Sequence, residues 1–219
     1  MIEAVIFDMD GLLVDSEPWW RVAEGNVFGR LSQCPTEEDF ERMMGNRVQE
    51  VIRQWHERYP WENFSEETTM SEIITEVSGL VTGNAQLLPG VKETLQFFAE
   101  RNLPIALASS SPLQLIRLLM THYGIYDAFS VVCSAEHESH GKPHPAVFLS
   151  AARHLGMDPT RCLVFEDSFN GLIAAKAARM KCVVVPMASH FEQTRFDCAD
   201  LKLRSLTEFS EEKWELLNK

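Results

Sequence analysis

The amino-acid sequence predicts an α/β protein in which helices cover both faces of a parallel sheet. Three observations indicate this fold class. Short apolar runs recur along the chain, amphipathic helical patterns separate them, and the segment after the first run contains helical patterns alone. Strands that are apolar throughout are typical of parallel sheets buried on both faces. We therefore expect a Rossmann-like core with a small α-helical domain inserted after its first strand.

The first predicted strand is short, β-branched and almost wholly apolar, as a buried strand is. The predicted strands cover residues 2–7, 103–108, 130–133, 162–165 and 182–185. The predicted helices of the core cover residues 91–101, 112–123, 145–155 and 168–180. Pro112 is typical of a first helical position, Gly124 of a helix end, and Ser111 of the N-cap residue before that helix.

The segment from about residue 18 to residue 83 contains helices without an intervening strand. Apolar residues follow the spacing i, i+3, i+4, i+7 at residues 48–55 and again at 70–77, which is typical of amphipathic helices. Residues 60–65 interrupt the pattern, and Ser65 is a candidate N-cap for the second helix. We therefore expect a helical cap domain at residues 15–84 and an α/β core formed by residues 1–14 and 85–219.

The composition is that of a globular protein with a sizeable core. The chain has 219 residues, 45% of them hydrophobic, and a formal charge of −12. This acidic balance argues against binding to nucleic acids or to anionic membranes, which requires clustered Lys and Arg. The sequence also lacks an apolar run of about 18 residues and a basic, signal-like N-terminus. We expect a monomeric protein.

The cysteines are five in number, scattered, and form no CxxC pair. They are Cys34, Cys133, Cys162, Cys182 and Cys198. An odd number of unpaired thiols argues against a disulfide framework and against a structural zinc site. We expect a cytoplasmic protein with reduced thiols.

Polar side chains follow four of the predicted strands, where the strands leave the sheet. They are Asp8 and Asp10, Ser109, Lys142, and Glu166 with Asp167. Ligands of open parallel sheets bind outside the carboxyl ends of the strands. Several carboxylates brought together there would repel one another unless a cation lies among them, and an all-oxygen ligand set indicates Mg²⁺. Mg²⁺ leaves positions for a phosphate, which the serine hydroxyl and the lysine ammonium can also bind.

The spacing of Asp8 and Asp10 is itself informative, because residues i and i+2 of an extended segment point the same way. One carboxylate can attack phosphorus as a nucleophile. The other can donate a proton to the leaving oxygen and then activate water. Gly11 allows the backbone to bend closely around this site.

Each of these signals is weak alone. A single DxD has many false positives, a serine can be an N-cap, a lysine can be solvated, and Glu166 with Asp167 can be acids at a helix N-terminus. A receiver domain also collects acids, a hydroxyl and a lysine. Its phosphorylated aspartate ends a middle strand, however, and this chain has Ser109 there. The order of all four signals favours a phosphate-transferring site.

These residues resemble the four motifs of the haloacid dehalogenase superfamily phosphatases. The segment from Phe7 to Glu17 is similar to the first motif, and Ala108 to Ser111 to the second. Lys142 to Pro145 is similar to the third, and Glu166 to Ser168 to the fourth. The likeness is greatest to the β-phosphoglucomutase-like branch, and within it to bacterial hexitol and 2-deoxyglucose-6-phosphate phosphatases.

The resemblance implies Mg²⁺-dependent hydrolysis of small phosphomonoesters, of the sugar or polyol class, through an aspartyl-phosphate. Asp8 would be the nucleophile and Asp10 the acid/base. Mg²⁺ would bind the Asp8 carboxylate, the Asp10 backbone carbonyl and Asp167. Glu166 would bind it directly or through a water molecule. Ser109, Lys142 and backbone N–H groups near Ser110 would hold the phosphoryl group.

Substrate selection would fall to the cap, where the candidates are Trp19, Trp20, Gly45, Asn46 and Arg47. Core packing is the simpler interpretation for at least one of the tryptophans. Two other enzymatic functions are alternatives, those of a β-phosphoglucomutase and of a phosphoglycolate phosphatase. A non-enzymatic binding protein on this fold is a third alternative. The mutases that resemble this chain carry a cap-hinge histidine where Trp20 stands here, and this difference favours hydrolysis.

Overall fold

The computed structural model describes residues 1–31, 33 and 35–219. Within this part of the chain, one parallel sheet has the strand order β3-β2-β1-β4-β5-β6. The strands are β1 (Ala4–Phe7), β2 (Ile105–Ser109), β3 (Val131–Ser134), β4 (Cys162–Glu166), β5 (Lys181–Val184) and β6 (Leu201–Lys202). The strand order reverses between β1 and β4, so these two adjacent strands flank the position where open α/β sheets bind ligands. The predicted Rossmann-like α/β fold is confirmed.

Two layers of helices cover the sheet because successive strand residues point to opposite faces. Val5 and Phe7 pack in one cluster with α5 (Val91–Ala99), α6 (Leu113–His122) and α9 (Glu211–Asn218). Ala4 and Ile6 pack in another with α7 (Ala146–Leu155) and α8 (Phe169–Ala177). Every residue of β1 is buried, as its apolar sequence predicts.

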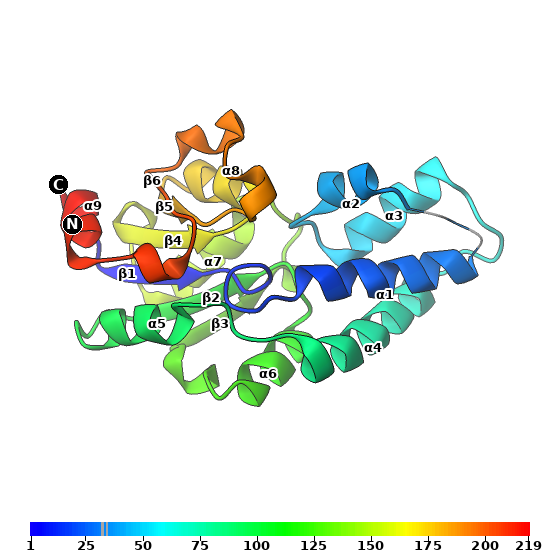
Figure 1. Cartoon of the computed structure of the whole chain (residues 1–219), viewed down its shortest axis with the longest axis horizontal. Helices are drawn as coiled ribbons and strands as arrows, with labels where there is room; N and C mark the ends of the chain where they lie inside the picture. Colours follow the sequence, from blue (N-terminus) through cyan, green and yellow to red (C-terminus); the bar gives the residue numbers. More distant parts are fainter. Residues whose placement is uncertain (32, 34) are drawn as a thin grey trace.

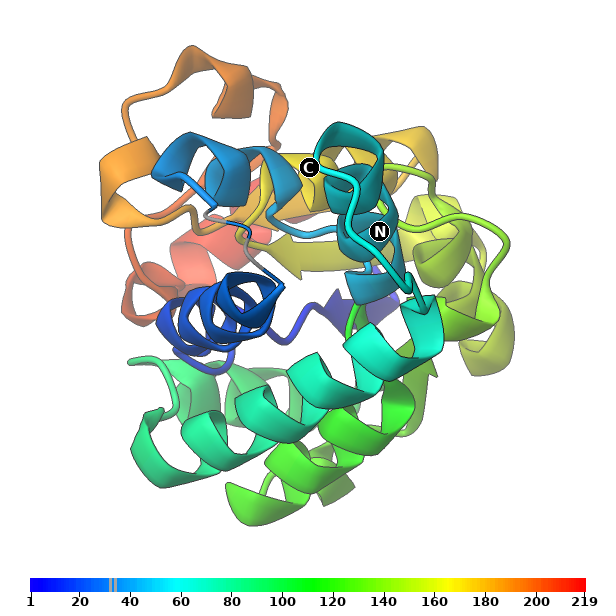
Figure 2. The same ribbon diagram turned by 90° about the vertical axis from the view of Figure 1, so that its right-hand side faces the viewer.

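The remaining helices lie beyond the carboxyl ends of the strands (Figure 1). They are α1 (Glu17–Arg30), α2 (Glu37–Met43), α3 (Val48–Arg58) and α4 (Glu66–Asn84). They enclose a separate cluster around Phe28 and Trp55. Figure 2, which looks onto this end, shows α1 and α4 side by side. Their apolar faces also reach the main core through Ala23, Val77 and Val81.

The chain passes between the sheet and these helices along two adjacent segments. The Asp15 N–H donates to the Gln86 carbonyl over 3.0 Å, and the Leu88 N–H donates to the Leu13 carbonyl over 2.9 Å. We refer to residues 15–84 as the helical insert. The insert is therefore attached to the sheet by two connections that are hydrogen-bonded to each other.

The structure differs from the predicted elements in a few places. Ser65 caps α4 as predicted, since its side chain accepts from the Thr68 N–H. The N-cap role of Ser111 is wrong: Pro112 occupies that position, and the Ser111 hydroxyl donates to Asp10 instead. The Glu136 carboxylate accepts from the Leu113 N–H in its place. The sequence analysis did not propose β6, which has two residues and no apolar run to reveal it.

The thiols of the described chain are free. Cys133, Cys162 and Cys182 are buried, whereas Cys198 is exposed. Cys34 lies outside the described residues. Across the ranges that the structure covers, no helix has both the length and the apolar character to cross a membrane.

Candidate active site

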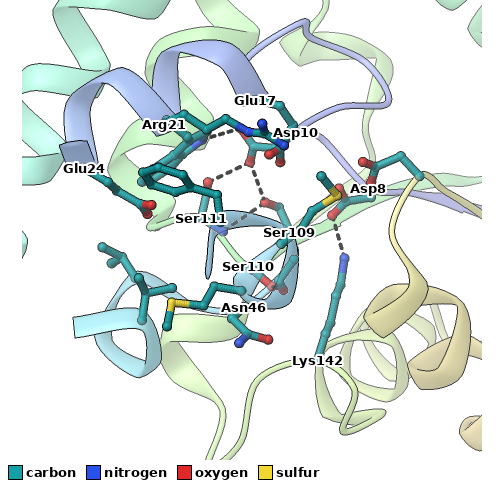
Figure 3. Close-up of a pocket in the computed structure, with 18 residues that line it drawn as sticks. Asp8, Asp10, Glu17, Arg21, Glu24, Asn46, Ser109, Ser110, Ser111 and Lys142 are labelled. Atoms are coloured by element: carbon teal, nitrogen blue, oxygen red, sulfur yellow. Dashed lines mark hydrogen bonds and ion pairs between the residues drawn. The ribbon is translucent and has the colours of Figure 1, made fainter. Parts of the chain in front are cut away.

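A pocket lies between the sheet and the helical insert, and both contribute side chains to it (Figure 3). From the sheet side come the carboxyl ends of β1, β2 and β4 and the loop that carries Lys142. From the insert come α1 and the segment at residues 40–51. The lining residues of the core are Asp8, Asp10, Ser109, Ser110, Ser111, Lys142 and Asp167. Those of the insert are Glu17, Trp20, Arg21, Glu24, Phe40, Met43, Met44, Gly45, Asn46, Val48 and Val51.

Lys142 joins the ends of β1 and β4. Its ammonium donates to Asp8 Oδ1 and to Glu166 Oε1, over 2.6 Å in each case. Burial alone would lower the pKa of Lys142, but the two carboxylates outweigh it and raise the pKa above its usual range. Lys142 is therefore a fixed positive charge beside the carboxylate of Asp8.

Asp8, Glu166 and Asp167 form a group of three buried carboxylates with ligand atoms within 4.8 Å of one another. Burial raises the pKa of Asp8 well above its ordinary value, and burial does the same to the pKa of Asp167, where Glu166 adds to the rise. One ammonium opposes three carboxylates here, so the fully ionised cluster has a net charge of −2. A divalent cation would balance it.

The structure supports a cation at one atom in particular. Asp167 Oδ2 is buried and has no hydrogen-bond partner among the described residues. Gly11, whose φ is +71°, faces this oxygen, and a Cβ there would come within 2.3 Å of it. A buried polar atom without a partner is costly. An all-oxygen set with an unpaired, buried carboxylate oxygen fits Mg²⁺.

Glu166 contributes least to such a site, because its oxygens already have partners. Oε1 accepts from Lys142. Oε2 accepts from the N–H groups of Asp167 and Ser168 over 2.9 and 2.8 Å and from the Ser168 hydroxyl over 3.0 Å. Glu166 is completely buried. Its contacts orient Lys142 and the start of α8, next to Asp167.

Asp10 accepts hydrogen bonds from four side chains. Ser16 and Trp20 donate to Oδ1 over 2.6 and 2.9 Å. Ser111 donates to Oδ2 over 2.7 Å, and Ser109 lies at 3.4 Å from the same oxygen. The Asp10 carboxyl is thus oriented toward the pocket by donors from both the core and the insert.

Two of the predicted substrate residues connect the insert to the core. The Gly45 carbonyl accepts from the Ser110 hydroxyl over 2.7 Å. The Asn46 side-chain oxygen accepts from Asn170 over 3.0 Å. Gly45 has a φ of +80°, and a Cβ there would come within 2.7 Å of Ser168 Oγ. Both residues line the pocket.

The structure places Arg47 elsewhere, and this corrects its expected position at the substrate. Its guanidinium pairs with Glu50 at 2.5 Å and donates to the carbonyls of Ala135 and Glu138. Arg47 is absent from the described residues that line the pocket. These contacts hold the insert against the loop before Lys142.

The tryptophans differ. Trp19 packs against the main core. Trp20 packs against both the main core and the cluster of the insert, lines the pocket and donates to Asp10. The sequence analysis did not identify Ser16, Ser111 or Glu24 as site residues. Glu24 had a visible signal: it shares the apolar face of α1 with the buried residues Ala23, Val27 and Phe28.

The pocket lies where the strand order of the parallel sheet reverses. It combines two aspartates, a buried lysine and a buried carboxylate oxygen without a partner, which is the arrangement of an enzyme active site. The chain belongs to the haloacid dehalogenase-like hydrolase family, whose model matches residues 2–179. The recognition of this superfamily from its motifs is confirmed.

Among its relatives, hexitol phosphatase B of Escherichia coli K12 is 41% identical over 95% of both chains. Fructose-1-phosphate phosphatase YqaB of the same strain is 30% identical over 83% of this chain and 95% of its own. Among solved structures, β-phosphoglucomutase of Clostridium difficile has a TM-score of 0.86 at 25% identity and covers 100% of this chain and 98% of its own. CbbY of Rhodobacter sphaeroides, in complex with phosphate, has a TM-score of 0.85 at 25% identity, and the match covers 95% of this chain and 96% of its own.

Proposed function

We propose that this hydrolase is a Mg²⁺-dependent phosphatase of small phosphomonoesters of the sugar or polyol class. The observation that carries the proposal is the placement of Asp8 beside both Lys142 and the carboxylates at the end of β4, with Asp10 two residues further along the chain. The names of the two Escherichia coli relatives support the substrate class.

In the proposed reaction, a carboxylate oxygen of Asp8 attacks phosphorus, and the bond from phosphorus to the ester oxygen breaks. Asp10 gives its proton to that leaving oxygen, which departs as an alcohol. Asp10 then takes a proton from water as the water attacks the aspartyl-phosphate, which releases phosphate and regenerates Asp8. Lys142 and Ser109 would bind the phosphoryl oxygens and offset their charge.

Mg²⁺ would be held by the side chains of Asp8 and Asp167, with the Asp10 backbone carbonyl as a further ligand, and Glu166 beside them. When bound, it would supply positive charge that lets a phosphate dianion approach the carboxylates. The fit rests on the buried, unpartnered Asp167 Oδ2.

We further propose the division into a core, residues 1–14 and 85–219, and a cap, residues 15–84. The connections at residues 13–15 and 86–88 support it, since they are the two places where the chain passes between the parts. A cytoplasmic location and a monomeric state belong to the same proposal. The buried free thiols support the former.

The test is a panel of phosphomonoesters with Mg²⁺, in which released phosphate is measured for the wild type and for Asp8→Asn. We expect hydrolysis of hexitol and hexose phosphates and of p-nitrophenyl phosphate by the wild type alone. Absence of hydrolysis across the panel would refute the proposal, as would an active Asp8→Asn enzyme.

Two enzymes with the same core are separated by the same panel. Preferential hydrolysis of phosphoglycolate would instead identify a phosphoglycolate phosphatase. Conversion of β-glucose 1-phosphate to glucose 6-phosphate, with a trace of the bisphosphate and without release of phosphate, would identify a mutase.

A further inference from the structure

Glu24 is a buried carboxyl group that faces the pocket from α1. Its side chain has an exposed fraction of 9%, and it lines the pocket together with Trp20 and Arg21. Figure 3 shows it on the α1 side, away from Lys142. The mechanism proposed above does not use this residue.

Among the described residues, none donates a hydrogen bond to the Glu24 carboxyl or forms an ion pair with it. The neighbouring cation, Arg21, pairs with Glu37 instead. Burial raises the pKa of Glu24 to about 8, with a further rise from Glu17 and a smaller opposing effect from Arg21. Near neutral pH the group is therefore mainly a neutral acid, able both to donate and to accept a hydrogen bond.

The position of Glu24 relative to Asp10 sets the part of a substrate it can contact. Trp20 donates to Asp10, and Glu24 follows one helical turn later on the same face of α1. One turn corresponds to roughly 6 Å along the helix. A group bound by Glu24 therefore lies several bonds away from the ester oxygen beside Asp10.

The charges of this end of the pocket disfavour a second anion. Among the described lining residues, the cations are Arg21 and Lys142, and both are paired with carboxylates. Glu17 lines the pocket as well and adds a carboxyl group next to Arg21. A second phosphate or a carboxylate would find no uncommitted cation here, whereas a neutral hydroxyl would find Glu24.

We propose that Glu24 binds a hydroxyl group on the part of the substrate remote from its phosphate, and so selects neutral, polyhydroxylated phosphomonoesters. This inference rests on the proposed function and narrows its substrate class. It predicts that a six-carbon polyol phosphate is preferred over glycerol 3-phosphate, which is too short to reach Glu24. It also predicts that a bisphosphate of the same length is a poor substrate.

The test compares the kcat/KM for sorbitol 6-phosphate with that for p-nitrophenyl phosphate, which has no hydroxyl chain. We expect Glu24→Leu to lower this ratio by roughly tenfold or more, mainly through KM, because the hydroxyl loses its partner. Glu24→Gln should recover part of the ratio, since an amide also donates and accepts. Glu57→Gln, a matched change at an exposed residue of α3, should leave the ratio at the wild-type value.

Three results would overturn the inference while leaving the phosphatase assignment intact. They are an unchanged ratio in folded Glu24→Leu, wild-type activity on p-nitrophenyl phosphate but on no polyol phosphate, and equal wild-type activity on the mono- and bisphosphate. A wild-type protein that hydrolyses none of the esters would instead overturn the proposed function, and this inference with it. Thermal unfolding of each variant establishes that it is folded.

Discussion

The indole nitrogen of Trp20 donates a hydrogen bond to Oδ1 of Asp10 over 2.9 Å. Trp20 belongs to α1 in the helical insert, whereas Asp10 follows β1 at the edge of the sheet. The orientation of the Asp10 carboxyl therefore depends on where the insert lies. Under the proposed mechanism, Trp20 is a positioning residue that aligns the acid/base group when the insert covers the pocket.

Replacement of Trp20 by Phe removes the N–H donor and keeps an aromatic ring. We expect kcat to fall roughly tenfold with little change in KM, because one hydrogen bond to a reacting carboxyl is lost. Steady-state kinetics with p-nitrophenyl phosphate measure both constants. Trp19→Phe is the matched control, since Trp19 packs against the core without lining the pocket. Equal losses in the two variants would contradict a positioning role for Trp20.

The Asp8→Asn and Asp10→Asn variants should be blocked at different steps of the reaction. Asp8→Asn lacks the attacking carboxylate, so no acid-stable label from radioactive phosphate ester should appear on the protein. Asp10→Asn lacks the group that activates water, so an ester with a good leaving group should phosphorylate the enzyme, and the label should accumulate. Labelled Asp8→Asn protein would rule out Asp8 as the nucleophile.

Removal of divalent metal should abolish hydrolysis, and Mg²⁺ should restore it. Mg²⁺ at about 100 times its dissociation constant should also raise the unfolding temperature of the wild type by roughly 5–10 °C. Asp167→Asn should lose this shift, because the buried oxygen that fits the cation becomes part of a neutral amide. Full activity in excess chelator, or an equal shift in Asp167→Asn, would refute the metal site.

Glu24 should make the protein less stable as the pH rises. Its pKa is raised from 4.5 to about 8 in the folded state, so the folded protein binds a proton that the unfolded chain has lost between these values. The stabilisation is complete below pH 4.5 and is lost as the pH rises through about 8. We therefore expect Glu24→Gln to gain free energy of unfolding relative to the wild type between pH 5.5 and pH 8.5. Urea unfolding at pH 5.5 and at pH 8.5 measures the free energy of unfolding of each variant, with Glu57→Gln as the control. The same difference between Glu24→Gln and the wild type at both pH values would contradict the prediction.

The buried thiols should resist alkylation while the protein is folded. Burial raises the pKa of Cys133 and of Cys162 to about 11, and that of Cys182 also well above its ordinary value. The reactive thiolate is therefore scarce near neutral pH. Mass spectrometry after treatment with iodoacetamide should find these three unmodified and the exposed Cys198 modified. In urea, all four should react, which controls for the reagent.

The order of the elements and the core of the site were accessible from the sequence because both depend on local patterns. The continuous apolar residues of β1, β2 and β4 identify buried parallel strands, and a parallel sheet brings their carboxyl ends to one edge. The sequence alone therefore predicts that Asp8, Ser109 and Asp167 lie together. Gly11 was also recognisable, since a close backbone approach after a strand is typical of glycine.

Tertiary structure decided how the insert meets this edge, because rigid packing between distant segments leaves no periodic trace in the sequence. Ser111 has the local signature of an N-cap, yet its hydroxyl is drawn to Asp10, while Glu136 from another loop serves the helix end. Arg47 stands in a segment that faces the pocket, yet carbonyls of residues 135 and 138 compete for its guanidinium. The sequence by itself thus determined which chemical groups gather at the sheet. Tertiary contacts decided which donors orient Asp10: Ser109 and Ser111 from the core, and Ser16 and Trp20 from the insert. They also decided that the Glu24 carboxyl lies in the pocket, because its place there depends on how the insert packs on the sheet.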